Sequence, residues 1–267
     1  MGELIEFPDV KQSRETVRKL KEDLEALLLE REHLRGVVCV NIQREYTLVF
    51  GGLEYQLYKA SCDYLRLRRK KDLIQAKKNR RERIDLKAVE AQLNEEFREY
   101  KKKLDEKMAE VNQALKASAM DYLSEEETKA IKKLYKQLVK RLHPDLNPSA
   151  TEAEIELFYR ATEAYKRGDL KALRLIDAVV EGSAPKDEPS SAVALEKESE
   201  RLLDLIDEVR KDIDGIQSNP PYTWRIYLED EKKKAEKLRQ LKEELANFKT
   251  AIKTQEAYIH DLIGDER

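Results

Sequence analysis

Residues 124–165 read SEEETKAIKKLYKQLVKRLHPDLNPSATEAEIELFYRATEAY. The segment opens with a capping box, because Ser124 is a good N-cap and Glu127 stands three residues later. Apolar residues then recur at helical spacing and predict one buried face, formed by Ile131, Leu134, Leu138 and Leu142. The rest of this helix is basic and carries Lys132, Lys133, Lys136, Lys140 and Arg141.

A turn and a second helix follow the basic helix. Pro144 cannot continue a helix and disfavours helical geometry at His143, so the first helix is predicted to end there. Turn-forming residues come next, namely Asp145, Asn147 and Pro148. Thr151 is the expected cap of the second helix, with Glu154 three residues on. Its inward-facing residues are predicted to be Phe158, Ala161 and Tyr165. The segment therefore predicts a compact helical hairpin with a rigid loop.

This arrangement resembles the J-domain of the DnaJ family. The segment AIKKLYKQLVKRLHPDLNP looks like that family's second helix followed by its His-Pro-Asp tripeptide. Phe158 and the pair Ala164-Tyr165 stand where the family's third helix carries packing residues. The resemblance implies docking on an ATPase chaperone of the DnaK type and stimulation of its ATP hydrolysis. It implies a docking face that contains Lys132, Tyr135, Lys136 and Lys140, and a trigger formed by His143, Pro144 and Asp145.

The chain also departs from the family pattern. Gln137 and Leu146 stand where bacterial members often carry a basic residue, which weakens the expected docking. The first J-domain helix is not recognisable, and residues 120–123 are either its remnant or the end of a preceding helix that replaces it. After Tyr165 the family's closing segment is absent, and Asp169 is expected to cap a further helix. The Gly/Phe-rich and cysteine-rich client-binding parts of a full DnaJ do not follow.

Residues 1–120 are predicted to form an N-terminal helical, coiled-coil arm. A helix from about residue 11 to 35 carries apolar residues at heptad spacing, which Arg31 interrupts and Gly36 is expected to end. Those apolar residues are Val17, Leu20, Leu24, Leu27 and Leu34. Residues 37–52 fit a helix better than a strand, with a short β-hairpin as the alternative.

Two further long helices of this arm are predicted to fold back on each other as an antiparallel pair, since each alone would leave its apolar stripe in water. The first runs to about Arg83, and the second follows Asp85, its expected N-cap. The second helix carries a single apolar stripe, formed by Leu86, Val89, Leu93, Phe97, Tyr100, Leu104, Met108, Val111 and Leu115.

The remaining boundaries follow from composition and spacing. Residues 121–181 form the J-domain-like module, and the Pro- and Ser-rich residues 182–191 read as a linker. Residues 192–267 are predicted to form a C-terminal antiparallel helical hairpin around a turn at residues 219–221, with heptad-like apolar residues in both helices. The N-terminal helix is left open as a partner of this hairpin. The predicted fold is all-α, with elongated antiparallel coiled-coil hairpins and a small J-domain-like helical module.

Composition excludes several classes of function. The 52 basic and 54 acidic residues nearly cancel, which argues against the whole chain being a nucleic-acid or membrane binder. Apolar runs fall short of the roughly 20 residues that span a bilayer. Cys39 and Cys62 form neither a disulfide framework nor a metal motif, which fits a reducing compartment. The N-terminus lacks a signal-peptide pattern, so a cytoplasmic location is expected.

The sequence thus predicts a co-chaperone or adaptor that is not an enzyme and uses no cofactor or metal. Its expected partners are a DnaK-type chaperone and a client of unknown identity. One alternative is a structural coiled-coil scaffold whose J-like module is inactive. A second is nucleic-acid binding through the basic run from Arg66 to Arg83, although pairing of that run with acids on a neighbouring helix is favoured. Homo-oligomerisation through the coiled coil stays open.

Overall fold

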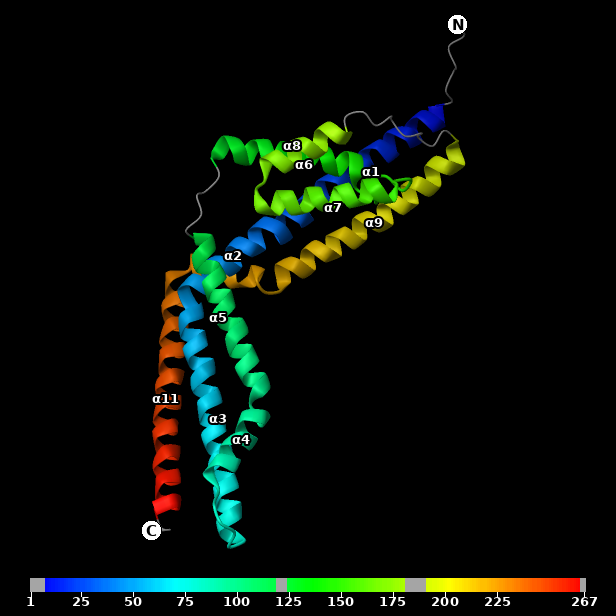
Figure 1. Cartoon of the computed structure of the whole chain (residues 1–267). Helices are drawn as coiled ribbons and strands as arrows, with labels where there is room; N and C mark the ends of the chain where they lie inside the picture. The colour runs from blue at the N-terminus through cyan, green and yellow to red at the C-terminus, as the bar shows by residue number, and fades with distance from the viewer. Residues whose placement is uncertain (1–7, 119–123, 181–190, 265–267) are drawn as a thin grey trace. The chain divides into compact units, whose positions relative to one another are not determined.

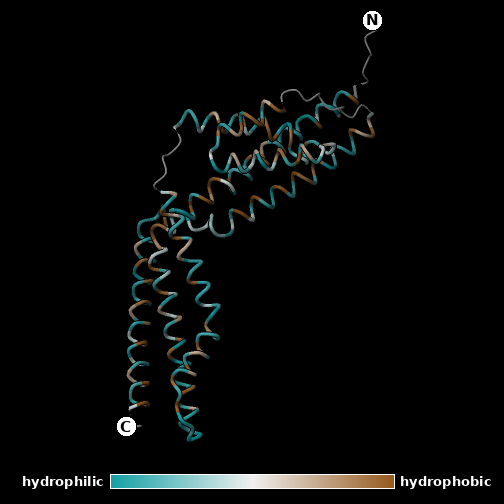
Figure 2. Tube along the Cα trace, in the orientation of Figure 1, coloured by the Kyte–Doolittle hydropathy of each residue, from teal (hydrophilic) through white to brown (hydrophobic). Residues whose placement is uncertain are grey.

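A computed structural model of the chain describes residues 8–118, 124–180 and 191–264 (Figure 1). These residues form helices and turns and contain no strand, which confirms the all-α class. Apolar residues recur at intervals along the helices (Figure 2). Within the described ranges, no helix is long and apolar enough to cross a membrane. The chain divides into two compact units. Unit 1 comprises Met1–Asn41 and Asp121–Thr223, and unit 2 comprises Ile42–Met120 and Trp224–Arg267.

Unit 1 places two long helices side by side and packs a small helical module against them (Figure 1). Its helical segments are α1 (Pro8–His33), the π-helical η1 (Leu34–Val38), α6 (Glu125–Leu142), α7 (Glu152–Arg167), α8 (Leu170–Val180) and α9 (Ala192–Ser218). Helices α1 and α9 run parallel, and Arg35 beyond the end of α1 pairs with Asp212 near the end of α9 at 3.1 Å. We call their shared apolar face the α1–α9 seam, which contains Val17, Leu24, Leu28, Leu202, Ile206, Val209 and Ile213.

The boundaries of α6, α7 and α8 follow the predicted capping residues. Both capping boxes are present, one on Ser124 and the other on Thr151. Gly168 ends α7 in the left-handed region, at φ 68, where a glycine carries no steric penalty. Asp169 then caps α8, because its Oδ1 accepts a hydrogen bond from the backbone N–H of Ala172 at 2.9 Å.

The ambiguous segment after α1 is helical, so the β-hairpin alternative is wrong. The helix continues through η1, α2 (Cys39–Tyr46) and the π-helical η2 (Thr47–Gly51). Gly36, which was expected to end a helix, lies inside η1 instead. A Cβ at this position would stand 2.7 Å from Cγ of Lys166 on α7. Glycine is needed there for close approach of α7 and not for a helix end.

Unit 2 contains η2 and, in chain order, α3 (Gly52–Asn79), α4 (Leu86–Glu96), α5 (Arg98–Ser118), α10 (Ile226–Glu229) and α11 (Glu231–Gly264). The 3-10 helix η3 (Tyr222–Arg225) precedes α10 and includes the boundary between the units in the sequence. Helices α3 and α11 run parallel along their length (Figure 1). Their N-terminal ends meet at Glu54 and Lys237, 3.9 Å apart. Near their C-terminal ends, Lys78 Nζ donates to the carbonyl oxygen of Leu262 at 3.4 Å. An aromatic cluster at the start of α11 includes Tyr46, whose ring stacks on that of Trp224 at 4.5 Å.

The predicted helix after Asp85 is interrupted, and its apolar stripe shifts. Asp85 is the N-cap of α4, as expected, but the helix breaks at Phe97 before α5 begins. Each break of this kind shifts the following residues around the helix axis. In α5 it is Ala114 that is buried, while the predicted Leu115 is 53% exposed.

The basic run of α3 faces acids on α4. Arg66 and Lys70 both contact Glu90, each at 2.6 Å. Arg69 binds Glu96 through two hydrogen bonds, at 2.8 and 3.0 Å. Helix α3 ends at Asn79 and so does not reach the predicted limit at Arg83. These ion pairs agree with the favoured interpretation of the run as a solvated helix face paired with its neighbour.

The two units differ from the expected domain division. The sequence suggested an arm over 1–120 and a C-terminal hairpin over 192–267, but α9 packs along α1 in unit 1 and α11 packs along α3 in unit 2. The pairings of α1 with α9 and of α3 with α11 are parallel. Helix α3 runs antiparallel to α4 and α5, the helices predicted to fold back on it, with Arg66 against Glu90 and Tyr58 against Lys107. Heptad spacing identifies the face of a helix that is buried, yet several helices of this chain carry such a face, so the spacing cannot choose between partners.

The α1–α9 seam gives a stability prediction. We expect Leu202→Ala to lower the free energy of unfolding of unit 1 by about 2–5 kcal/mol, because Leu202 is 0% exposed and truncation leaves a cavity. Hydrogen exchange of the slowest α9 amides would measure the change. Leu203→Ala is the matched control, since its neighbour Leu203 is 52% exposed and should change stability by about 0.5 kcal/mol or less. Equal losses in the two variants would contradict the packing described.

Candidate partner-docking site around His143

The loop between α6 and α7, residues 143–151, is tied to the end of α6; we call it the His143 loop. The carbonyl oxygen of His143 accepts hydrogen bonds from the backbone N–H groups of Leu146 and Asn147, at 3.1 and 2.9 Å. The side-chain amide of Asn147 donates to the carbonyl oxygens of Lys140 and His143, each at 3.2 Å. These bonds satisfy carbonyls that the end of α6 leaves without helical partners, so the loop is rigid.

His143 is buried and holds the loop from inside. It is 4% exposed, and its ring meets the ring of Phe158 edge-on with centroids 4.7 Å apart. Its Nδ1 accepts a hydrogen bond from the backbone N–H of Asp145 at 3.1 Å, so the imidazole is the neutral Nε2–H form. Burial lowers the pKa of His143, and the Asp145 carboxylate opposes this effect only in part.

Asp145 presents its carboxylate at the rim of the loop. The side chain is 35% exposed, and its Oδ2 lies 3.7 Å from Nδ1 of His143. Pro144 is half-buried beside it. The three residues of the predicted trigger therefore lie together, with the histidine inside and the aspartate facing outward. His143 acts on the shape of the loop, and Asp145 is the member that a partner can reach.

Tyr135 does not belong to an exposed docking face. It is 1% exposed, its ring stacks on that of Tyr165 at 4.1 Å, and its hydroxyl lies 3.1 Å from Oγ1 of Thr162. Burial raises its pKa. On α6, Tyr135 follows Ile131 by four residues and precedes Leu138 by three, so it shares their buried face. The resemblance suggested docking through Tyr135, and the structure corrects that assignment to core packing.

The basic face of α6 remains largely at the surface. Lys132, Lys133 and Lys140 are exposed. Lys136 is 65% exposed and lies 3.8 Å from the largely buried Glu25 of α1, so part of its charge is already paired within the chain. The face still presents several cations beside the His143 loop, which suits an acidic partner.

Sequence reasoning missed the contacts that α9 makes with the loop. Arg201 on α9 donates from Nη1 to the carbonyl oxygen of Asp145 at 3.1 Å. Leu146 is buried in the same apolar cluster as Leu195 and Leu202 of α9. The burial of Leu146 accounts for an apolar residue where the family often has a basic one. No local signal could have found these contacts, because the sequence assigned α9 to a different hairpin.

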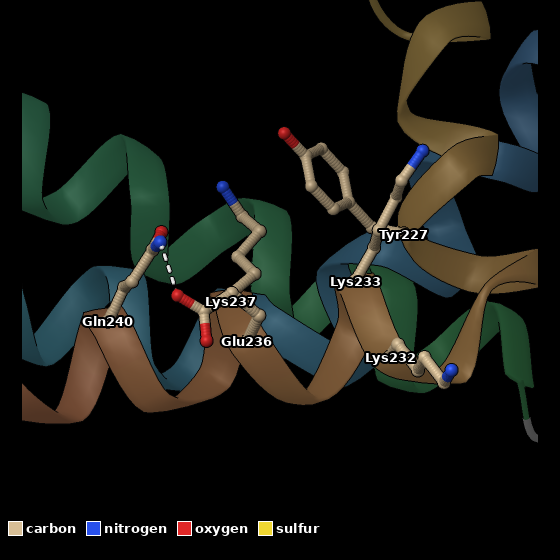
Figure 3. Close-up of a pocket in the computed structure, with 6 residues that line it drawn as sticks. All are labelled: Tyr227, Lys232, Lys233, Glu236, Lys237 and Gln240. Carbon is tan, nitrogen blue, oxygen red and sulfur yellow. Dashed lines mark hydrogen bonds between the residues drawn. The ribbon is translucent and has the colours of Figure 1, made fainter.

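A surface depression at the start of α11 lies in unit 2. It is lined by Tyr227, Lys232, Lys233, Glu236, Lys237 and Gln240 (Figure 3). Its polar groups pair within the chain. Gln240 donates to Glu236 at 2.8 Å, and the ammonium of Lys237 lies 4.9 Å from the centroid of the Tyr227 ring. The depression therefore offers a weaker candidate for a partner site than the His143 loop does.

Comparison with known proteins gives one short match. A 36-residue segment, 14% of this chain, is 61% identical to the Chaperone protein DnaJ of Lachnospira eligens, and the match covers 9% of that protein. The similarity supports a J-domain-like region and does not extend to the rest of DnaJ. No protein-family model matches the chain. No solved structure matches it either.

Burial of histidine makes the stability of unit 1 depend on pH. The pKa of His143 is lower in the folded protein than the ordinary 6.5, and burial and Lys132 lower that of His33 as well. The unfolded chain therefore binds more protons as the pH falls below about 6.5. We expect the free energy of unfolding to fall between about pH 7 and pH 5, by at most about 1.4 kcal/mol per pH unit for each histidine.

Urea unfolding across this pH range would measure the effect. His143→Gln should remove the part of the pH dependence of the free energy of unfolding that is due to His143. His260→Gln should leave the slope unchanged, because the His260 side chain is 87% exposed. A slope in His143→Gln equal to that of the unsubstituted protein would contradict the buried neutral imidazole.

Proposed function

We propose that this protein is a co-chaperone that docks on an ATPase chaperone of the DnaK type and stimulates its ATP hydrolysis. It is an adaptor and not itself an enzyme in this proposal. The observation that carries the proposal is the His143 loop. The buried His143 side chain fixes the loop through a hydrogen bond from the Asp145 N–H, and the Asp145 carboxylate faces outward. The basic face of α6 lies beside the loop. The short match to DnaJ supports the same function.

The physical properties of the site suit this role. Exposed lysines on α6 attract an acidic surface and raise the rate of encounter. A loop fixed by internal hydrogen bonds has little conformational entropy to lose on binding, so more of the interaction energy appears as affinity. The Asp145 carboxylate is available as a hydrogen-bond acceptor for a cationic side chain of the partner, which is the stronger class of hydrogen bond.

The remaining helices have a separate role in this proposal. The client-binding parts of a full DnaJ were not recognised in the sequence, so the long helices of units 1 and 2 would bind a client or a further partner. A cytoplasmic setting goes with this function. It is supported by Cys39 and Cys62, which are buried and free as a reducing compartment predicts.

The first test is steady-state ATP hydrolysis by a DnaK-type chaperone with and without the full chain. We expect stimulation by the unsubstituted protein, and its reduction by about tenfold or more in His143→Gln and in Asp145→Asn. The Asp145 variant removes a charge from a partly exposed side chain, so it tests the site even if loss of His143 unfolds the loop. His260→Gln is the matched control and should stimulate normally.

Two outcomes would contradict the proposed function. One is the absence of stimulation by the folded, unsubstituted protein. The other is full stimulation by both His143→Gln and Asp145→Asn, because the loop would then play no part.

The second test concerns the charge of α6. Replacing Lys132, Lys133 and Lys140 with glutamate should raise the half-saturating concentration in the ATPase assay by about tenfold or more at low salt, and by less at high salt. A matched triple variant of exposed lysines on α11, at Lys242, Lys249 and Lys253, changes the net charge equally and should have little effect. Equal losses in both variants would show a general effect of charge and not a docking face.

A scaffold without chaperone activity is a second candidate, and the pairing of Lys136 with Glu25 favours it. A cation that binds within the chain is less available to a partner. This candidate predicts that the protein forms a stable complex with another protein while the ATPase rate stays unchanged.

A further inference from the structure

Arg201 connects α9 to the His143 loop through one well-defined contact. Its guanidinium binds the Glu198 carboxylate through Nε and Nη2, each at 2.8 Å, which fixes the plane of the group. The remaining nitrogen, Nη1, donates to the backbone carbonyl of Asp145 at 3.1 Å. Glu198 is itself largely buried, and the Arg201 guanidinium lowers its pKa. The donor is therefore held in place before it meets the loop.

The next residue of the loop is buried in an apolar cluster to which α9 also contributes. Leu146 is buried in the cluster that also contains Leu195 and Leu202 of α9. The backbone N–H of Leu146 donates to the carbonyl of His143 at 3.1 Å. The peptide group between Asp145 and Leu146 is thus bonded on both sides, its carbonyl to Arg201 of α9 and its N–H to His143 within the loop.

The Arg201 contact engages the carbonyl of Asp145 and not its carboxylate. The carboxylate lies 3.7 Å from Nδ1 of the neutral His143 ring, and 35% of the Asp145 side chain is exposed. The basic face of α6 is also largely exposed. Helix α9 therefore holds the backbone of the loop and leaves the carboxylate accessible to a partner.

We propose that Arg201 and Leu146 are positioning residues for docking, and that α9 acts as an intramolecular brace that orients the Asp145 carboxylate toward the chaperone. The proposal rests on the co-chaperone function proposed above and adds to its site Arg201, which lies outside the J-domain-like module. Loss of one hydrogen bond from a charged donor frees the peptide group and lowers the fraction of loops in the docking conformation. The expected change in apparent affinity is about five- to tenfold.

The experiment uses the full chain and three variants. Arg201→Ala removes the contact. Arg201→Lys retains a cation that can reach the carbonyl, but it cannot chelate Glu198 in the same way. Arg210→Ala is the control, because Arg210 is exposed on the same helix. Two quantities are measured: the half-saturating concentration for stimulation of a DnaK-type ATPase, and the hydrogen-exchange rates of the Leu146 amide and of the α9 amides.

We expect Arg201→Ala to raise the half-saturating concentration and to speed exchange at Leu146, each about five- to tenfold, with a near-normal maximal rate. For both quantities, Arg201→Lys should give values between those of Arg201→Ala and the unsubstituted protein. Arg210→Ala should match the unsubstituted protein. Exchange of the α9 amides should not change, which separates positioning from a loss of overall stability.

The possible failures are distinguishable. If the unsubstituted protein does not stimulate the ATPase, both the proposed function and the proposed role of α9 as a brace are contradicted. If it does stimulate the ATPase, but Arg201→Ala behaves like Arg210→Ala, only the proposed positioning role of Arg201 is contradicted. Stronger stimulation by Arg201→Ala would also overturn the brace, because the contact would then restrain docking. Faster exchange throughout α9 would show that Arg201 only stabilises the helix pair.

Discussion

The apolar seam between α1 and α9 is the contact on which the described arrangement of unit 1 depends. These helices are separated by more than half of the chain, yet they run parallel and bury leucine and isoleucine side chains such as Leu24, Leu28, Leu202 and Ile206. Burying such side chains is the dominant favourable term in helix association. The seam also holds Arg201 beside the His143 loop, so a contact far from the loop in sequence decides how the loop is held.

The local features of the site could be predicted from the sequence because each depends on residues close together in the chain. The capping boxes at Ser124 and Thr151, the end of α6 before Pro144 and the inward position of Phe158 all follow from spacing within one or two turns. Such short-range rules need no knowledge of the partner helix.

The features that could not be predicted depend on tertiary contacts. Gly36 looked like a helix end and is a point of close approach to Lys166. Tyr135 looked like a docking residue and is stacked on Tyr165 in the core. The pairing of α9 with α1 was only an open alternative, and that of α11 with α3 was not predicted, because one heptad pattern fits many partners. In each case the residue type allowed two roles, and a helix distant in sequence selected one of them.

The burial of His143 changes how the tripeptide should be understood. A neutral imidazole with 4% exposure cannot form the outer surface of a docking site. It supplies an acceptor for the Asp145 N–H and an apolar contact with Phe158, both of which fix the loop. In the proposed function His143 would serve recognition only through the shape of the loop, so loss of recognition in a His143 variant would not by itself prove direct contact with a partner.

Electrostatics links the departures from the family pattern to the contacts of α9. The resemblance places a basic residue where this chain has Leu146, so the loop itself lacks one positive charge. Arg201 brings a guanidinium to the carbonyl of Asp145 from a different helix. The hydrogen bond to Glu198 is the main cause that raises the pKa of Arg201, and the Asp145 charge adds to it. Leu146 is buried in an apolar cluster to which the same helix contributes. The guanidinium is paired with the Glu198 carboxylate, so it holds the Asp145 carbonyl without adding a net positive charge to the loop. Because Arg201 lies on α9, the electrostatics of the loop depend on the packing of helices outside the module.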